Sequence, residues 1–327
     1  MLGWEKIQVP KLYYTDLTAG YEDCLRRGFE YTGITIRSGE NVFVKPNLTY
    51  PTYQPGVMTS PKLIEALVVY LKNFTDKISL CEADSGGYNP FRMDEVFERT
   101  GLTELSRRYG VRLINFSNVE AMDIPVKNGS STFPAPFPKV VKEECERFIT
   151  VPVFKVHLNT RISVALKNQW ALIPIPAKRL DLHPSFSQVI YAVNKNLPNP
   201  MAIVDGTFGL TRTGPLRGDA VALNSMVVSD NLFYTDLFAT QFMGVSRKAV
   251  HHIDYALRQE GIDDLSALET NMNLGTLPLF RSRLEREWTD YPGLLCFKSK
   301  TLAYVGYKSP LAKSLHWLLY KFRTPFY

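Results

Sequence analysis

The 327-residue sequence has few of the features that mark secreted, membrane-spanning or metal-cluster proteins. Its four cysteines are scattered, and no pair has the close spacing of a zinc or iron–sulfur site. No run approaches the roughly 18 apolar residues that cross a bilayer. The N-terminal stretch MLGWEKIQVP lacks the basic-then-apolar layout of a signal peptide. We therefore expect a cytoplasmic protein with reduced thiols and no iron–sulfur cluster.

Nucleotide-binding and nucleophile signatures are missing too. The sequence contains neither a G-x-x-x-x-G-K-[ST] phosphate loop nor a G-x-G-x-x-G fingerprint. It also has no nucleophile elbow and no recognisable Ser-His-Asp order. A nucleotide cofactor is therefore unsupported, and the cofactor, if any, is unknown from the sequence.

Acidic residues are absent from the end of the chain. The net charge is +6, and the last acidic residue is Asp290. Six basic residues follow it: Lys298, Lys300, Lys308, Lys313, Lys321 and Arg323. Because these six equal the whole excess, the first 290 residues are close to neutral. A basic body that binds nucleic acid is not indicated, and the interaction signal belongs to the tail.

Short apolar runs alternate with stretches of helical periodicity, as in parallel α/β proteins. We predict strands at 41–45, 77–82, 111–115, 151–157, 201–205 and 224–229, a helix over 21–27 that stops at Gly28, and a strand near 302–305. The predicted fold is α/β with a mostly parallel sheet and crossover helices. It has an N-terminal half at 1–115, a second half of the same unit at 116–295 and a basic appendage at 296–327. The proline-rich part of the second half, near 120–140, reads as an irregular excursion.

The tail predicts a basic amphipathic helix. Ser309 and Pro310 are a typical helix start. An apolar stripe follows at helical spacing: Leu311, Leu315, Leu318, Leu319 and Phe322. One interpretation is a terminal helix docked on its own domain. The other is a helix at 309–327 that binds a protein partner or an anionic membrane, which would place the protein on the inner face of the membrane.

The densest cluster of functional groups lies in residues 151–170, VPVFKVHLNTRISVALKNQW. Lys155 and His157 are two residues apart at the end of a predicted strand, so they share one face of it. Lys167 and Asn168 follow within a few residues. In parallel sheets ligands bind beyond the carboxyl ends of the strands, which places the site here.

Other predicted strands also end in functional groups. One strand ends with Lys45 and Asn47, another with Glu82 and Asp84, and a third with Asp205. One interpretation is a single cleft that holds both signs of charge. The alternative is that the lysines pair with Asp84 and Asp205 and simply tie the strand ends together.

Several of these groups have more than one reading. Ser85-Gly86-Gly87 and a predicted glycine-rich loop at Gly206–Gly218 offer backbone N–H groups to an anion or are only tight turns. Neighbouring lysines would lower the pKa of His157 and favour a neutral imidazole, suited to general-base work. A divalent metal held by Asp84, Asp205 and His157 is allowed, but no local ligand spacing demands it.

The ordered motifs resemble a known family. VKPNL at 44–48, EADSGG at 82–87, FKVH at 154–157, ALKN at 165–168 and VDG at 204–206 together resemble the bacterial and archaeal domain-of-unknown-function family 362, over roughly residues 40 to 245. Some members carry ferredoxin-like cysteine clusters that this chain lacks. The family is distantly similar in fold to nickel-pincer lactate racemases, which implies a fold and no reaction.

The leading hypothesis is an enzyme that acts on an anionic carboxylate or phosphate by acid–base chemistry, with or without a metal, and isomerase- or lyase-type proton transfer is the expected reaction. The expected catalytic residues are His157, Lys155 and Asp205. The expected substrate-binding residues are Lys45, Asn47, Ser85, Gly86, Lys167, Asn168 and His183. The alternative is a non-catalytic anion-binding or scaffold protein.

Overall fold

The computed structural model describes residues 9–86, 89 and 91–322. Within them, ten strands form one sheet. They are β1 (Lys11–Asp16), β2 (Val42–Pro46), β3 (Ile78–Glu82), β4 (Arg112–Asn115), β7 (Arg147–Val151), β8 (Val153–His157), β9 (Arg161–Ser163), β10 (Pro200–Thr211), β11 (Asp219–Ser229) and β12 (Glu269–Thr270). The order is β12-β1-β11-β10-β7-β2-β3-β4, with β8 paired to β10 and β9.

The centre of this sheet is parallel. Strands β10, β7, β2, β3 and β4 run parallel to one another, and β8 runs parallel to β10. Strands β11 and β1 extend the sheet in the antiparallel sense. The predicted α/β fold with a mostly parallel sheet is therefore confirmed.

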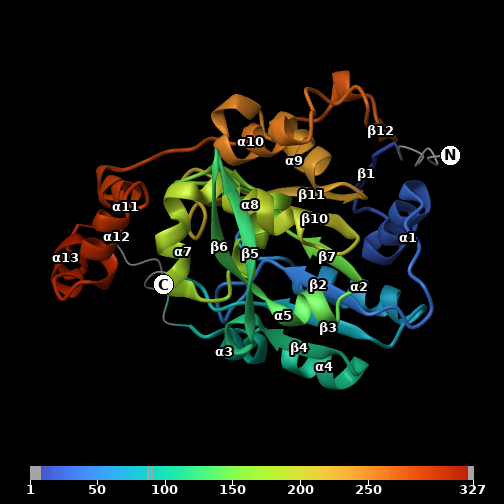
Figure 1. Ribbon diagram of the computed structural model, residues 1–327. Coiled ribbons are helices and arrows are strands. Elements are labelled where there is room, and N and C mark those ends of the chain that lie inside the picture. Colours follow the sequence, from blue (N-terminus) through green and yellow to red (C-terminus); the bar gives the residue numbers. More distant parts are fainter. Residues whose placement is uncertain (1–8, 87–88, 90, 323–327) are drawn as a thin grey trace.

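Helices cover both faces of the sheet (Figure 1). One face carries α1 (Gly20–Thr32), α2 (Pro61–Lys72), α3 (Met93–Arg99) and α4 (Leu102–Tyr109). The other carries α5 (Lys139–Glu143), α6 (Ala165–Asn168), α8 (Phe186–Lys195), α9 (Leu232–Phe242) and α10 (His251–Gln259). Strand β2 contributes to both layers of the core: Val42 and Val44 pack on the face that carries α1 to α4, and Phe43 packs on the other face. Side chains of a strand alternate between faces, so a fully apolar run fills both layers.

The proline-rich stretch is not irregular. It forms a two-stranded hairpin of β5 (Ala121–Asn128) and β6 (Ser131–Pro138). Pro134, Pro136 and Pro138 recur at every second position of β6. Because N–H groups of a strand point alternately towards and away from the partner, prolines at this spacing leave the ladder intact.

Two predictions that took a glycine as a helix stop or as the start of a loop were wrong, because these glycines lie where two elements pack closely. Helix α1 passes through Gly28 and ends at Gly33, whose φ of 71° is left-handed. A Cβ atom at Gly28 would lie 2.4 Å from Cγ2 of Val228, so glycine lets the helix approach β11. Likewise, Gly206 lies inside β10 and not in a loop, and a Cβ there would meet Oγ of Ser225 at 2.5 Å.

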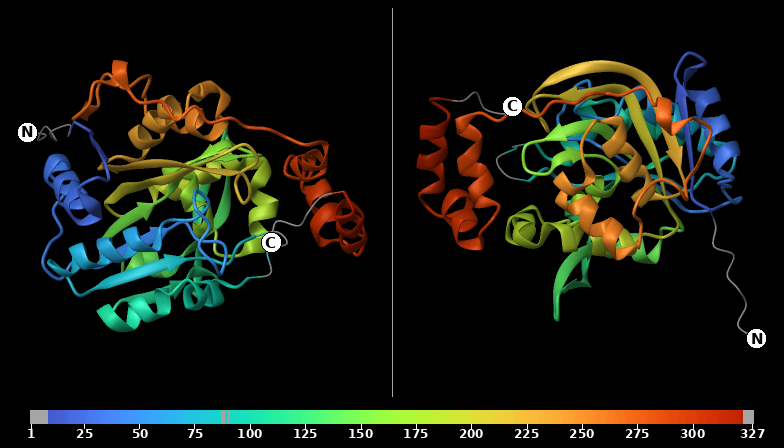
Figure 2. Two further views of the ribbon diagram at one scale, coloured as in Figure 1. Left: turned by 180° about the vertical axis from the view of Figure 1, so that it is seen from behind. Right: turned by 90° about the horizontal axis from the view of Figure 1, so that it is seen from above.

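Residues 288–322 form a helical C-terminal cap. It contains a 3-10 turn (Trp288–Asp290), α11 (Tyr291–Cys296), α12 (Lys300–Ala303), a π-helical turn (Tyr304–Lys308) and α13 (Ala312–Leu319). The strand predicted near 302–305 is therefore wrong, because that segment is helical. The two views of Figure 2 place the cap beside α7 (Pro176–Leu182), on the far side of the sheet from α1. The end of the predicted tail helix, residues 323–327 with Arg323, lies outside the described residues.

The cap is attached to the body at a few points. Lys308 forms a 2.6 Å ion pair with Asp181 of α7. The ring of Phe297 lies on that of His183, with centroids 4.2 Å apart. Arg286, just before the cap, donates a 2.7 Å hydrogen bond to the Leu158 carbonyl oxygen. In the part of the chain that the structure describes, no helix is both long and apolar enough to cross a bilayer.

Candidate functional site

A cavity of about 360 Å³ lies between the carboxyl ends of β2, β3 and β8 and the C-terminal cap. It gathers the predicted substrate-binding residues and two of the predicted catalytic ones. These lining residues are Lys45, Asn47, Ser85, Gly86, Lys155, His157, Lys167, Asn168 and His183. Gly87, the last residue of the same motif, lies outside the described residues. The cap closes the other side with Phe297, Tyr307 and Tyr320.

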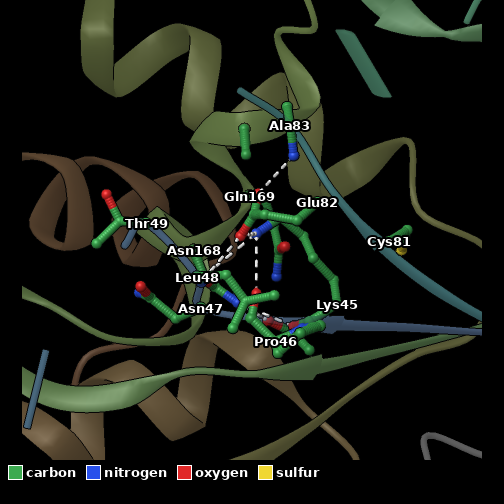
Figure 3. Close-up of polar contacts among 12 residues, drawn as sticks. Lys45, Pro46, Asn47, Leu48, Thr49, Cys81, Glu82, Ala83, Asn168 and Gln169 are labelled. Carbon is green, nitrogen blue, oxygen red and sulfur yellow. Dashed lines mark hydrogen bonds and ion pairs between the residues drawn. The ribbon is translucent and has the colours of Figure 1, made fainter. Parts of the chain in front are cut away.

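A buried ion pair forms the floor of this cavity. Nζ of Lys45 lies 2.7 Å from Oε2 of Glu82, and both side chains are almost fully buried. Oε1 of Glu82 accepts a 2.9 Å hydrogen bond from the backbone N–H of Ala83. Figure 3 shows Lys45 pointing towards Glu82 and Asn168. Lys45 does tie strand ends together, but its partner is Glu82 and not Asp84 or Asp205.

The short helix α6 carries Lys167 and Asn168 into the cavity. Its first backbone N–H groups, at Ala165 and Leu166, donate to the carboxylate of Asp236 at 2.7 and 3.1 Å. Burial raises the pKa of Asp236 to about 7, while those two hydrogen bonds act in the opposite direction. Asp236 therefore positions α6 from beneath, a role that sequence reasoning missed.

Lys155 and Lys167 are the most unusual groups in the site. Nζ of Lys155 donates 3.0 Å hydrogen bonds to Oδ1 of Asn47 and the carbonyl oxygen of Val57. Nζ of Lys167 lies 5.7 Å from the ring centroid of Phe186. Neither lysine forms an ion pair with any carboxylate of the described chain.

The pKa of each lysine is lowered to about 7. For Lys155 the largest cause is burial, followed by the charge of Lys167, and the carboxylate of Glu82 opposes both. For Lys167 the cause is again burial, followed by the positive charges of Lys45 and Arg179. A protonated lysine buried here has no ion-pair partner among the described residues, so its charged form is disfavoured.

Two histidines of the cavity, His157 and His183, are neutral at pH 7. Burial, with the charges of Lys167 and Lys155, holds the pKa of His157 well below its usual value. Nδ1 of His157 accepts a 3.1 Å hydrogen bond from the backbone N–H of Asn159, so the proton of the neutral ring is on Nε2. Burial and Lys167 lower the pKa of His183 to about 3.

Asp205 and Asp84 do not line this cavity. Asp205 accepts hydrogen bonds from the backbone N–H of Ser60 at 2.6 Å and of Thr207 at 2.9 Å. Asp84 accepts a 2.7 Å hydrogen bond from the backbone N–H of Met93. Each carboxylate thus holds the start of a helix, α2 or α3, where the helix dipole favours negative charge.

The structure therefore does not bring Asp84, Asp205 and His157, the three expected metal ligands, into one site. Across the described residues there is no group of three or more His, Cys, Asp or Glu side chains arranged to hold a metal ion. The geometry assigns Asp205 to the support of the loop around Ser60 and not to the cavity wall.

Sequence reasoning missed some lining residues. Arg179 is buried and donates 2.7 Å hydrogen bonds to the carbonyl oxygens of Ile173 and Asp84. Burial lowers its pKa to about 10. Glu82 stood at a predicted strand end and was recognisable from that position. Nothing local in the sequence shows that Arg179 or the cap would reach the same cavity.

A second cavity of about 640 Å³ adjoins the first and shares Asn159, His183, Leu294 and Phe297 with it. Its charged and titratable lining residues are Arg161, Arg286, Lys298, His251 and His252. No acidic side chain is among the described residues that line it. His183 therefore lies between the first cavity and a second one whose charged lining residues are all basic.

The fold and the cavity define an α/β protein with a cationic site at the carboxyl edge of a parallel sheet. The sequence profile of the family described as "domain of unknown function (DUF362)" matches residues 42–241, more than half of the chain. The chain therefore belongs to this family, as the ordered motifs indicated. The C-terminal cap lies beyond the matched residues.

Comparisons with curated sequences and with solved structures add no conclusion about function. No curated protein sequence matches. The lactate racemase apoprotein of Thermoanaerobacterium thermosaccharolyticum is similar with 14% identity and a TM-score of 0.41, covering 72% of this chain and 57% of that one. A Thermotoga maritima protein is similar with 10% identity and a TM-score of 0.42, covering 73% and 59%. This chain thus spans less than two thirds of either structure, and these values carry no conclusion about a reaction.

Proposed function

We propose that this protein is an enzyme that binds a small carboxylate or phosphate anion in the first cavity and transfers a proton on it. Isomerisation or elimination next to a carboxylate is the reaction class that fits. The observation that carries the proposal is the pair Lys155 and Lys167, whose pKa values are lowered to about 7 in one cavity.

The balance of charge supports an anionic ligand. Lys45 is neutralised by Glu82, and Asp290 also lines the cavity, whereas Lys155, Lys167 and Arg179 form no ion pair with a carboxylate of the described chain. At about 4 Å and an effective dielectric near 20, each unit charge attracts a bound anion by about 4 kcal/mol. An anion would therefore supply the missing counter-charge and raise the pKa of both lysines.

The same groups support proton transfer. A general acid or base works best when its pKa lies near the working pH, and such a group contributes about 10²- to 10⁴-fold to the rate. Lys155, deprotonated in part at pH 7, can accept a proton while Lys167 holds the anion. His157 is neutral, with its proton on Nε2, and can serve as the partner acid or base.

The test is hydrogen exchange at carbon. The full chain is incubated in D₂O with a panel of 2-hydroxy, 2-oxo and phosphorylated hydroxy acids. NMR follows loss of the signal of the carbon-bound hydrogen next to the carboxylate or, in the 2-oxo acids, next to the keto group. We expect exchange for at least one anion, and a loss of at least about 100-fold in Lys155→Met. Lys127→Met, which removes an exposed lysine of β5, is the matched control and should exchange like the wild type.

Binding is measured in the same samples by calorimetry. Anions that bind with no exchange of hydrogen in the whole panel would favour the non-catalytic anion-binding or scaffold protein. If no anion of the panel binds, or if Lys155→Met binds and exchanges like Lys127→Met, the lysines are structural and the proposal is wrong.

A further inference from the structure

The apolar stripe of the terminal helix faces away from the body of the protein. Leu311 and Phe322 are each 63% exposed, Leu318 is 51% exposed and Leu315 is 45% exposed. These four residues recur at intervals of four, three and four, so they form one continuous face of α13 and its ends. A helix docked on its own domain would bury such a face.

The opposite face of α13 is already in use. Ala312 is buried, and His316 and Tyr320, four and eight residues on, line the first cavity. His316 Nε2 lies 3.0 Å from the carbonyl oxygen of Gly306 within the cap. The orientation of the helix is therefore set by the cavity side, and the leucine stripe is left in solvent.

Large aromatic side chains surround the exposed stripe. Trp288 is 64% exposed, and its ring meets that of Phe322 edge-on with centroids 5.5 Å apart. Trp317 is 63% exposed, with Nζ of Lys321 3.8 Å from its ring centroid. Other exposed apolar residues of the same cap are Tyr291, Leu295, Leu302, Tyr304 and Val305. Surfaces of this kind mark interaction sites, since soluble monomers seldom expose so many large apolar side chains together.

The charge of the cap selects the partner. Its lysines are Lys298, Lys300, Lys308, Lys313 and Lys321, and no acidic residue follows Asp290. Lys308 is paired with Asp181, and the other four form no ion pair with any residue that the structure describes. Two copies of this basic face would repel each other, whereas an anionic lipid surface attracts it. Tryptophan, tyrosine and lysine around a leucine face are typical of interfacial helices.

We propose that the C-terminal cap is a membrane-binding lid. The stripe of Leu311, Leu315, Leu318 and Phe322 enters an anionic bilayer, with the lysines at the headgroups, while the inner face of the same helix closes the first cavity. The unpaired lysines attract the anionic headgroups at low salt, and added salt screens this attraction. The inference rests on the exposure of the cap and not on the reaction proposed above.

The test is flotation of the full chain with vesicles of phosphatidylcholine alone and of phosphatidylcholine with phosphatidylglycerol. We expect flotation only with the anionic vesicles, and release at high salt. The double variant Leu315→Gln/Leu318→Gln should lose at least tenfold in the bound fraction. Both residues are exposed, so the fold should be kept, and an unchanged melting temperature verifies it. The matched control Leu279→Gln/Val221→Gln, which replaces two exposed apolar residues outside the cap, should float like the wild type.

Three results would overturn this proposal. They are no flotation of the full chain with anionic vesicles at low salt, flotation of the stripe variant equal to that of its control, and a dimer in light scattering that the stripe variant dissociates. The last would make the stripe a contact between two copies. Lys155→Met should float like the wild type even if it no longer binds anions. The anion-site proposal and the membrane-binding proposal can therefore fail independently of each other.

Discussion

Anion binding to the first cavity should depend steeply on pH, because the free site holds its lysines near half-protonation. Lys155 and Lys167 both have a pKa of about 7 in the free protein, from burial and from their neighbours. An anion binds best when both are charged. Above pH 7, binding of the anion must therefore be accompanied by uptake of protons by these lysines.

The size of the effect follows from these pKa values. With two lysines at about 7, each is about half protonated at pH 7 and about 1% protonated at pH 9. If both must be charged, the binding constant falls about 100-fold per pH unit above 7, and about 10-fold if only one must be. Below about pH 6 the binding constant should no longer change with pH. At pH 7 the complex should take up about one proton.

Sulfate is the probe, because it keeps its charge across this range and lacks a reactive carbon. Its binding constant is measured by calorimetry from pH 6 to 9, in two buffers with different ionisation enthalpies, so that proton uptake is counted directly. Lys167→Met should halve the slope. It should also move the inflection to higher pH, because the charge of Lys167 is the second cause of the low pKa of Lys155.

A level binding constant from pH 6 to 9, with no proton uptake, would refute this reasoning. It would mean that the lysines are fully charged in the free protein or do not contact the anion. An unchanged slope in Lys167→Met would show that Lys167 lies outside the anion site. Lys127→Met again serves as the control, since its exposed side chain is remote from the cavity lining.

Two further predictions concern stability. The folded-state pKa of Lys167 is below its usual value of 10.5, so the folded chain binds fewer protons than the unfolded chain between about pH 7 and 10.5. The stability of the wild type should therefore fall as pH drops through that range, and Lys167→Met should raise the melting temperature at pH 6 and flatten this dependence. Glu82→Gln should lower the free energy of unfolding by about 3 to 5 kcal/mol in chemical denaturation at pH 7, because it leaves Lys45 buried without a counter-charge. An Lys167→Met melting temperature below that of the wild type at pH 6, or a Glu82→Gln loss under about 1 kcal/mol, would contradict the respective argument.

The sequence predicted the lysine and histidine cluster well for a physical reason. Alternation along β8 puts Lys155 and His157 on one face, and a parallel sheet collects its strand ends at one edge. Lys45 and Asn47 arrive at that edge by the same rule. Position within a strand thus carried these predictions, with no need for long-range information.

The two aspartates show the limit of that rule. A carboxylate at a strand end has two good partners, a ligand in the cleft or the N–H groups at the start of a neighbouring helix. Asp205 and Asp84 take the second, at Ser60 and Met93. The choice depends on which helix start lies within hydrogen-bonding distance, and the distance in sequence between Asp205 and Ser60 hides it.

The cap shows a different limit, one of direction and not of position. The apolar stripe of 309–322 was readable from its spacing, but the spacing of a stripe does not say whether it faces the body or the solvent. That is decided by Ala312, His316 and Tyr320, which occupy the cavity side and leave the leucines outside. The family match covers residues 42–241, which include the sheet side of the cavity and not this wall. The direction of the stripe therefore comes from the structure, because neither the spacing of its residues nor the family match determines it.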